Sequence, residues 1–443
     1  MTRSALLASA LLVTLSHAGE RLPATVQIPL TSRTEPARTR PALQRIVRAS
    51  LWLGVLGFGG GLSVLANIRA LVVERRRWLT EREFANTVTV SQMLPGGAAA
   101  NALAYIGLRF HGARGALAAY AGFIFPGWAC VMGLAWAYVH FGTTPDVETI
   151  LGGFNAAVVG IIAAITIKMV RTSVGRLWQM AVAAGALFMT VAGNAPPGEV
   201  ALLSIVTGIA VDLGTKRARL ARQRHPLSLP EEASLPEHRP PAPPRDGGLR
   251  VSSLTVVLAI AATGAIAMNW RELARSATVF FRTGLGSYGG GFAIVPHLKL
   301  VMERNHWLTT RQFADAVAIG KLTPGPVLLL ATFIGYVQQG PIGALVATVA
   351  IFAAPFGLVV MAGTWLDRLR SRRPVRSALR GLTPAVLGLM AAAAVTLGGT
   401  LNGDAEIGLA AAVTLTLSRF ELNPAVVLLV AGLARFALRT MGL

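Results

Sequence analysis

Two short proline–glycine segments carry the residue types that could bind an anion inside a helical protein. The first contains Pro95-Gly96 and the second contains Pro324-Gly325. Proline suits the first position of a helix, where its missing N–H would be unpaired anyway, so we expect each proline to open a helix. A helix N-terminus offers free N–H donors and the positive end of the helix dipole, and both favour an anion. The pattern predicts an anion site at these two helix starts; the alternative is a pair of kinked structural helices.

Side chains beside the prolines differ between the two segments. Thr323 precedes the second proline, where it would be a good N-cap, whereas Leu94 precedes the first and cannot cap. Lys321 lies three residues before Pro324, and its counterpart in the first segment is Gln92. A lysine in an apolar segment is costly to insert into a membrane, so Lys321 is either a counter-charge for an anionic substrate or a residue that snorkels to the interface.

Three carboxylates near these segments are candidates for coupling transport to an ion. Asp315 lies six residues before Lys321, and it could carry a coupling proton or pair with a basic neighbour. Glu74 and Glu303 each precede an arginine and lie close to a tryptophan. That pattern is more typical of an anchor at the membrane interface, with coupling as the alternative.

Glycine triplets precede both segments and should interrupt the helices that run into them. They are centred on Gly60 and Gly290, and a run of glycine is a poor helix interior and a good place to unwind. A capping box follows each triplet, with Thr80 three residues before Glu83 and Thr309 three residues before Gln312. Each half therefore predicts a broken helix, a short capped helix, and then the proline.

These matches belong to an internal duplication. The paired segments keep an offset of 228 to 230 residues, which chance does not maintain in register. The repeated features are Phe58–Gly61 with Tyr288–Gly291, Trp78–Thr80 with Trp307–Thr309, Pro95-Gly96 with Pro324-Gly325, and Gly115–Leu117 with Gly343–Leu345. Two long repeats of this kind are typical of secondary transporters.

Composition places the chain in a membrane. Of its 443 residues, 53% are hydrophobic and 14% are charged, whereas soluble domains average about 25% charged residues. The net charge of +21 would suggest a nucleic-acid partner in a soluble protein. In a membrane protein it is explained by basic cytoplasmic loops, so we expect a lipid bilayer and no nucleic acid. One cysteine and scattered histidines predict no metal site, cofactor or catalytic residue.

The predicted architecture is an all-α polytopic membrane protein with two inverted-topology repeats, broken helices and about 10–13 membrane segments. The only charged residues of the loop 142–148 are acidic, whereas its counterpart 366–380 is rich in arginine. The positive-inside rule puts these equivalent loops on opposite sides of the membrane. The predicted divisions are an N-terminal tail (1–44), a first repeat (45–214), a cytoplasmic Arg/Pro-rich linker (215–250), a connecting transmembrane helix (251–271) and a second repeat (272–443).

The first 18 residues resemble a signal peptide, with Arg3 before an apolar run. The arginine-rich stretch that follows is an unlikely segment to export. We therefore favour an over-extended start or a cytoplasmic tail.

With these residues in place, the chain resembles the chromate ion transporter family in its long, two-domain form. The resemblance rests on Phe58–Phe84, Ser287–Pro296, Leu322–Tyr336 and Asn423-Pro424, and it covers most of residues 45–443 apart from the linker. It implies a multi-pass protein of the bacterial inner membrane that exports chromate. Two positions depart from the family pattern: Gly97, where a second proline is usual, and Lys321, where glutamine is usual.

We therefore expect a secondary transporter of a divalent oxyanion, with chromate first and sulfate or another tetrahedral oxyanion as the alternative. An intramembrane enzyme is the alternative of another class, and the absence of a GxSxG motif argues against it. A homodimer is compatible with the sequence.

Overall fold

The computed structural model describes residues 40–57, 61–142, 144–222, 270–369, 373–420 and 422–441, and every element in these ranges is helical. The first half contains α2 (Leu43–Val55), α3 (Gly61–Arg69), the π-helix η1 (Ala70–Arg75), α4 (Glu81–Met93), α5 (Ala98–Phe141), α6 (Pro145–Ser173), α7 (Leu177–Val191) and α8 (Pro197–Arg222). The second half contains α10 (Trp270–Leu285), the 3-10 helix η3 (Gly289–Ile294), α11 (Val295–Arg304), α12 (Thr310–Leu322), the 3-10 helix η4 (Val327–Leu329), α13 (Leu330–Leu369), α14 (Arg373–Gly398), α15 (Asp404–Arg419) and α16 (Pro424–Thr440).

Local backbone geometry repeats between the two halves. Both predicted capping boxes are present, on Thr80 for α4 and on Thr309 for α12. The long helices α5 and α13 kink at matching positions, where Gly112 has φ +61° and Gly340 has φ +65°. These shared features confirm that the halves repeat one fold.

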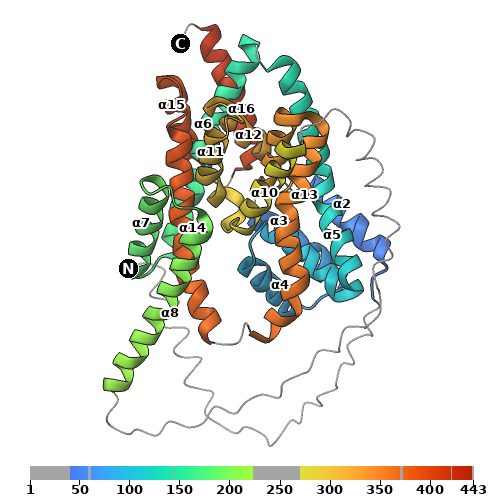
Figure 1. The fold of residues 1–443 in the computed structure, drawn as a ribbon, viewed down its shortest axis with the longest axis vertical. Coiled ribbons are helices and arrows are strands. Elements are labelled where there is room, and N and C mark those ends of the chain that lie inside the picture. Colours follow the sequence, from blue (N-terminus) through green and yellow to red (C-terminus); the bar gives the residue numbers. More distant parts are fainter. Residues whose placement is uncertain are drawn as a thin grey trace, which may run out of the picture. The chain divides into compact units, whose positions relative to one another are not determined.

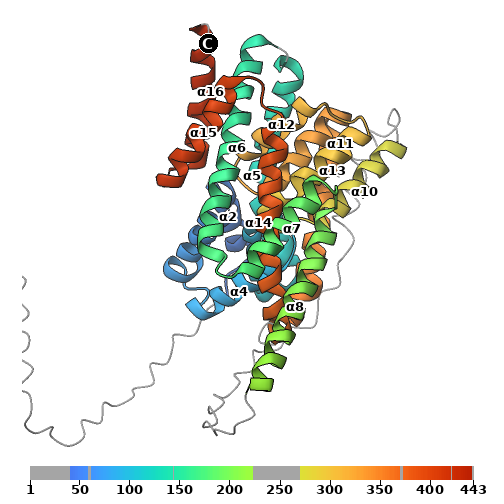
Figure 2. The same ribbon diagram turned by 90° about the vertical axis from the view of Figure 1, so that its left-hand side faces the viewer.

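The two repeats run in opposite directions. Figure 1 draws the end of α5 and the start of α6 at the top of the view, and the end of α13 and the start of α14 at the bottom. Figure 2, turned by 90°, shows the same arrangement. The inverted topology predicted from the loop charges is therefore present in the fold.

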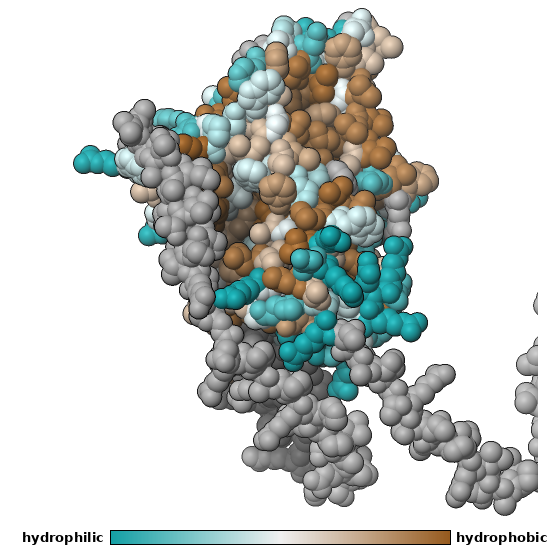
Figure 3. Space-filling model, turned by 90° about the vertical axis from the view of Figure 1, so that its right-hand side faces the viewer, coloured by the Kyte–Doolittle hydropathy of each residue, from teal (hydrophilic) through white to brown (hydrophobic). Residues whose placement is uncertain are grey.

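Helix length and apolarity identify a multi-pass membrane protein. Within the described residues, five helical segments are long and apolar enough to cross a bilayer: Ala98–Phe141, Pro145–Ser173, Pro197–Gly214, Val327–Met361 and Arg380–Gly398. Helices α7, α15 and α16 have 15, 16 and 17 residues, fewer than the roughly 20 that a span needs. Figure 3 shows a broad hydrophobic surface, with hydrophilic residues gathered toward the lower end of that face.

Several predicted segments lie partly or wholly outside the described residues. These are the tail 1–44 up to residue 39, Gly60, the linker 215–250 beyond residue 222, and the connecting helix 251–271 up to residue 269. The total of 10–13 membrane segments and the domain boundaries stay predictions.

Small residues let the first helix of each repeat pack tightly on the long helix. A Cβ atom on Gly54 of α2 would lie 2.5 Å from the Phe123 carbonyl oxygen of α5, and one on Gly284 of α10 would overlap the Ile351 carbonyl of α13. The contact is between backbones, so a side chain at either glycine requires the helices to separate.

We predict that Gly284→Ala destabilises the protein by about 1–3 kcal/mol, the usual cost of overpacking a tight contact. Gly357→Ala is the matched control, because a Cβ on this glycine of α13 meets nothing within 4 Å. Thermal unfolding in detergent should show a lower midpoint for the first variant and an equal or higher midpoint for the second. Equal midpoints for both variants would contradict the packing argument.

Candidate functional site

The helix breaks are longer than the sequence predicts. Helix α4 ends at Met93 and α5 begins at Ala98, whereas α12 ends at Leu322 and helical structure resumes at Val327. The expectation that Pro95 and Pro324 open helices is therefore wrong. A residue before proline is disfavoured in the α conformation, and both Leu94 (ψ 146°) and Thr323 (ψ 151°) are extended.

Thr323 consequently does not have its predicted role. It is the C-terminal cap residue of α12, not the N-cap of the next helix, and its hydroxyl donates to the Gly320 carbonyl at 3.3 Å. It remains buried in the break region, with 5% of its surface exposed. The predicted difference in capping between Thr323 and Leu94 is thus absent, because both end the preceding helix.

Backbone hydrogen bonds join each break to the other repeat. The Gly96 N–H donates to the Ser287 carbonyl at 2.8 Å, and the Gly325 N–H donates to the Gly57 carbonyl at 3.1 Å. Ser287 and Gly57 each lie just before a glycine triplet. Both glycines have a φ near +110° (+104° and +112°), which a side chain opposes. These two N–H groups therefore hold the repeats together and are not available to an anion.

The two actual helix starts lie close together. A Cβ on Gly97 would be 3.2 Å from the Pro326 Cβ, and these residues are the N-caps of α5 and η4. Neither start has a side-chain cap. Uncapped N–H groups and positive dipole ends from both repeats thus converge three residues beyond each predicted position, at a place suited to an anion.

Lys321 lies in the last turn of α12, five residues before Pro326 in the sequence. Its side chain is half-buried, and its ammonium lies 5.0 Å from the centre of the Phe292 ring, over the η3 segment. Within the described residues no carboxylate forms an ion pair with it, unlike Lys299, which lies 3.5 Å from Glu303. Gln92, its counterpart, is exposed, so the two repeats are not equivalent here.

Asp315 forms a buried contact between the repeats. Only 2% of its surface is exposed. Its Oδ2 accepts a hydrogen bond from the Tyr138 hydroxyl at 2.9 Å, and its Oδ1 accepts one from the Asn155 amide at 2.8 Å. One interpretation of the sequence paired Asp315 with a basic neighbour. In the described part of the chain its two hydrogen-bond donors are neutral side chains from α5 and α6.

Glu74 and Glu303 lie in exposed hydrogen-bonded pairs. Glu74 accepts from Arg69 at 2.6 Å, and Arg69 also bonds Glu81. These contacts raise the pKa of the Arg69 guanidinium, mainly through Glu81. Glu303 accepts from the Thr310 hydroxyl at 3.0 Å. Glu303 thus bonds α12 directly, whereas among the described residues Glu74 is connected to α4 only through Arg69. The anchor interpretation of both carboxylates stays a prediction.

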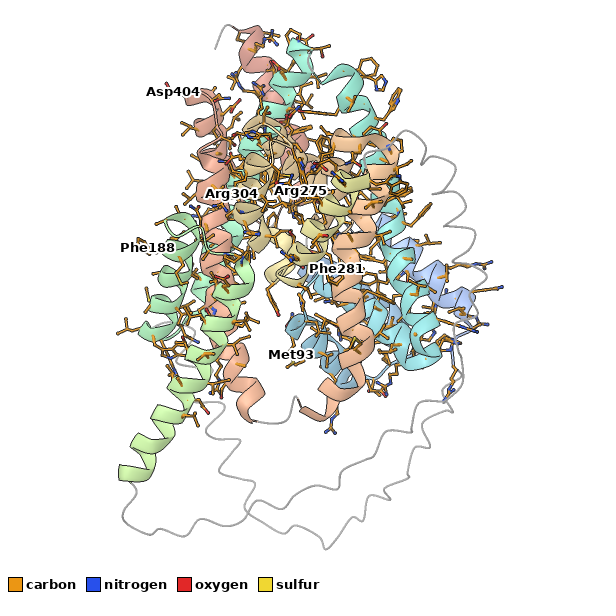
Figure 4. All side chains as sticks on the ribbon, in the orientation of Figure 1. Met93, Phe188, Arg275, Phe281, Arg304 and Asp404 are labelled. Carbon is orange, nitrogen blue, oxygen red and sulfur yellow. The ribbon has the colours of Figure 1, made fainter. Side chains whose placement is uncertain are left out.

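The structure places the remaining predicted residues at the same breaks. Pro95 and Pro324 are buried within the extended segments, and Gly290 belongs to η3. Figure 4 shows Met93, the last residue of α4, in the lower half and Arg304, the last residue of α11, in the upper half. The short motif helices thus approach the breaks from opposite sides. Tyr138, Asn155 and Phe292 were not singled out from the sequence, because none has a counterpart in a repeated motif.

Two inverted helical repeats that meet at paired breaks, with a half-buried lysine beside them, define a secondary-transporter architecture. The chain belongs to the chromate transporter family, whose model matches residues 44–211 and 274–436.

Similar proteins carry the same description over most of their length. A chromate transport protein of Cupriavidus metallidurans is 29% identical and covers 88% of this chain and 92% of its own length. A probable chromate transport protein of Synechococcus elongatus is 29% identical, covering 81% and 85%. A chromate transport protein of Pseudomonas aeruginosa is 26% identical, covering 87% and 89%. No solved structure matches the chain.

We predict that Gly325→Ala abolishes anion binding, because a side chain at φ +112° costs about 1–3 kcal/mol and distorts the break. Gly340→Ala is the control, since that residue also has positive φ but lies at the α13 kink with open space around it. Chromate binding per folded molecule should be lost only in the first variant. Equal chromate binding by both variants would show that the break at Gly325 is not part of the anion site.

Proposed function

We propose that this protein exports chromate across the bacterial inner membrane as a secondary transporter. The convergence of two uncapped helix starts beside Lys321 carries the proposal. The names of the relatives support chromate as the substrate. In the proposed orientation the lower end of Figure 1, where α13 ends and α14 begins, faces the cytoplasm, because the loop 366–380 is rich in arginine.

Charge arithmetic supports a dianion at this position. Each helix N-terminus supplies about half a positive charge, so two of them leave roughly one negative charge of a dianion uncompensated. The Lys321 ammonium supplies the remainder. The proposed site thus consists of Lys321, buried Thr323 and the two helix starts after Pro95-Gly96 and Pro324-Gly325. Gly290 and Gln92 are further predicted members, and Gly60, also predicted, lies outside the described residues. Sulfate has the same charge and shape, so it is the natural competitor in any test.

Asp315 is the proposed coupling group. A carboxylate buried at membrane depth is costly and usually functional, and efflux against a gradient needs a second ion. Proton entry in exchange for chromate would supply the energy. Glu74 and Glu303 are exposed and hydrogen-bonded, so they are weaker candidates.

We expect Lys321→Gln to weaken chromate binding by about 1–3 kcal/mol, the loss typical of a charge-assisted hydrogen bond. Lys321→Arg should retain more affinity, because it keeps the charge. Lys299→Gln is the control, since Lys299 is paired with Glu303. Chromate and sulfate uptake into everted vesicles, with and without an uncoupler, gives the measurement. Unchanged affinity in the glutamine variant would make Lys321 a snorkelling residue.

Asp315→Asn should uncouple transport from the proton gradient. The amide keeps an oxygen for one of the two neutral donors but cannot take a proton at working pH. In everted vesicles, the accumulation of chromate that a pH gradient drives should fall in this variant. Exchange of chromate across the membrane at equal pH on both sides should persist. Gradient-driven accumulation at the wild-type rate would exclude Asp315 as the coupling group.

A further inference from the structure

A polar pocket lies where the start of α6 meets α12, α15 and α16. Its volume is about 230 Å³, and its lining includes Glu148, Arg311, Glu406, Arg435 and Arg439. In the proposed orientation this end faces the outside, because the loop 142–148 carries only acidic charge. The proposed function leaves this pocket without a role.

Two arginines of the pocket, Arg311 and Arg439, donate to oxygens of the protein itself. Arg439 donates to the Pro145 carbonyl, to the Thr149 hydroxyl at 2.7 Å and to Asp146. Arg311 donates to the Glu148 carbonyl at 3.2 Å. These bonds fasten the ends of α12 and α16 to the start of α6. The pocket also contains two carboxylates, so a second oxyanion site is a poor fit to it.

One face of α6 connects the pocket to Asp315. Glu148, Gly152 and Asn155 are spaced at i, i+4 and i+7, so they lie on one side of the helix and span about 10 Å along it. Glu148 lines the pocket. Asn155 donates to Asp315, and Arg311, which also lines the pocket, lies one turn before Asp315 on α12.

Gly152 makes room for a buried carboxylate between these two levels. A Cβ at this position would overlap the Oε1 atom of Glu406. Glu406 has 8% of its surface exposed, and its Oε2 accepts the Asn402 N–H at 2.8 Å. Three carboxylates therefore follow one another along this face: Glu148 at the pocket, Glu406 beside Gly152, and Asp315 beside Asn155.

A buried hydrogen-bond acceptor lies beside Asp315, the last of these three carboxylates. The Oδ1 atom of Asn155 accepts no hydrogen bond from the described residues, although only 8% of the residue is exposed. Its amide nitrogen is already committed to Asp315. A buried acceptor without a partner among the described residues, on the residue that bonds Asp315, suits a proton donor that arrives along the α6 face.

We propose that this face is the route by which protons from the outside reach Asp315, with Glu406 as the relay. A proton taken up at the pocket binds the Glu406 carboxylate and is then passed to the Asp315 carboxylate, which leaves Glu406 ionised and Asp315 neutral. Chains of buried carboxylates serve as proton relays in other transporters. The charged and titratable groups around the route are Glu148, Arg311, Tyr138, Arg435 and Arg439. The inference rests on the proposed function, in which Asp315 carries the coupling proton.

The test compares two transport modes in proteoliposomes with Glu406→Gln. Glutamine keeps an oxygen for the Asn402 N–H but cannot relay a proton. Chromate transport driven by a pH gradient should fall at least about tenfold, while chromate exchange at equal pH should keep the wild-type rate. Asp404→Asn is the matched control: this acidic residue lies two positions away at the exposed start of α15 (Figure 4), and both modes should be unchanged.

Gly152→Ala is a second variant that displaces the Glu406 carboxylate without changing its chemistry, and it should show the same selective loss. If both variants lose both transport modes in equal proportion, the role of Glu406 is structural. If Glu406→Gln keeps full gradient-driven transport, Glu406 is not the relay. Either result overturns the proposal. Failure of the proposed function is distinguishable, because the wild-type protein itself would then move no chromate in either mode.

Discussion

Backbone hydrogen bonding at the helix breaks is the constraint on which this structure depends. Peptide groups that leave a helix at membrane depth must find partners within the protein, because the bilayer core offers none. Here the partner of each break is in the other repeat, through Gly96 to Ser287 and Gly325 to Gly57. Neither repeat could form its break alone at that depth. The proposed anion site would follow from this exchange: with those N–H groups paired across the repeats, the two uncapped helix starts come to lie close together.

Local patterns were predictable from the sequence because they are decided within a few residues. The capping boxes at Thr80 and Thr309 and the interruption before Gly290 follow from short-range rules, and the duplication is visible as the same local patterns occurring twice. The prediction that helices start at Pro95 and Pro324 was wrong for an equally local reason. Proline favours the first helical position, but it also disfavours the α conformation of the residue before it, and here the effect on the preceding residue prevailed. Contacts between distant segments, such as Asp315 with Tyr138 and Asn155, have no sequence signature and required the fold.

The duplication preserves the scaffold and leaves the charges unequal. Matching glycines keep the same strained φ values in both repeats, since those positions are fixed by backbone geometry. Asn86 and Gln92 of α4 correspond to Asp315 and Lys321 of α12. In the proposed function, the site uses the break of each repeat, but it needs only one counter-charge for a dianion and one coupling group. Confining both to α12 avoids an excess of uncompensated charge in the membrane.

The placement of both charges on α12 gives a physical basis for coupling. The helix is fixed at its middle by two hydrogen bonds to the Asp315 carboxylate from α5 and α6, and its last turn carries Lys321 beside the break. Hydrogen bonds to an ionised carboxylate are roughly twice as strong as those to a neutral group. A proton on Asp315 therefore weakens the attachment of α12 to the first repeat, at the helix that positions the counter-charge for the anion. By linkage, an anion that favours one position of α12 must change the affinity of Asp315 for its proton by the same factor.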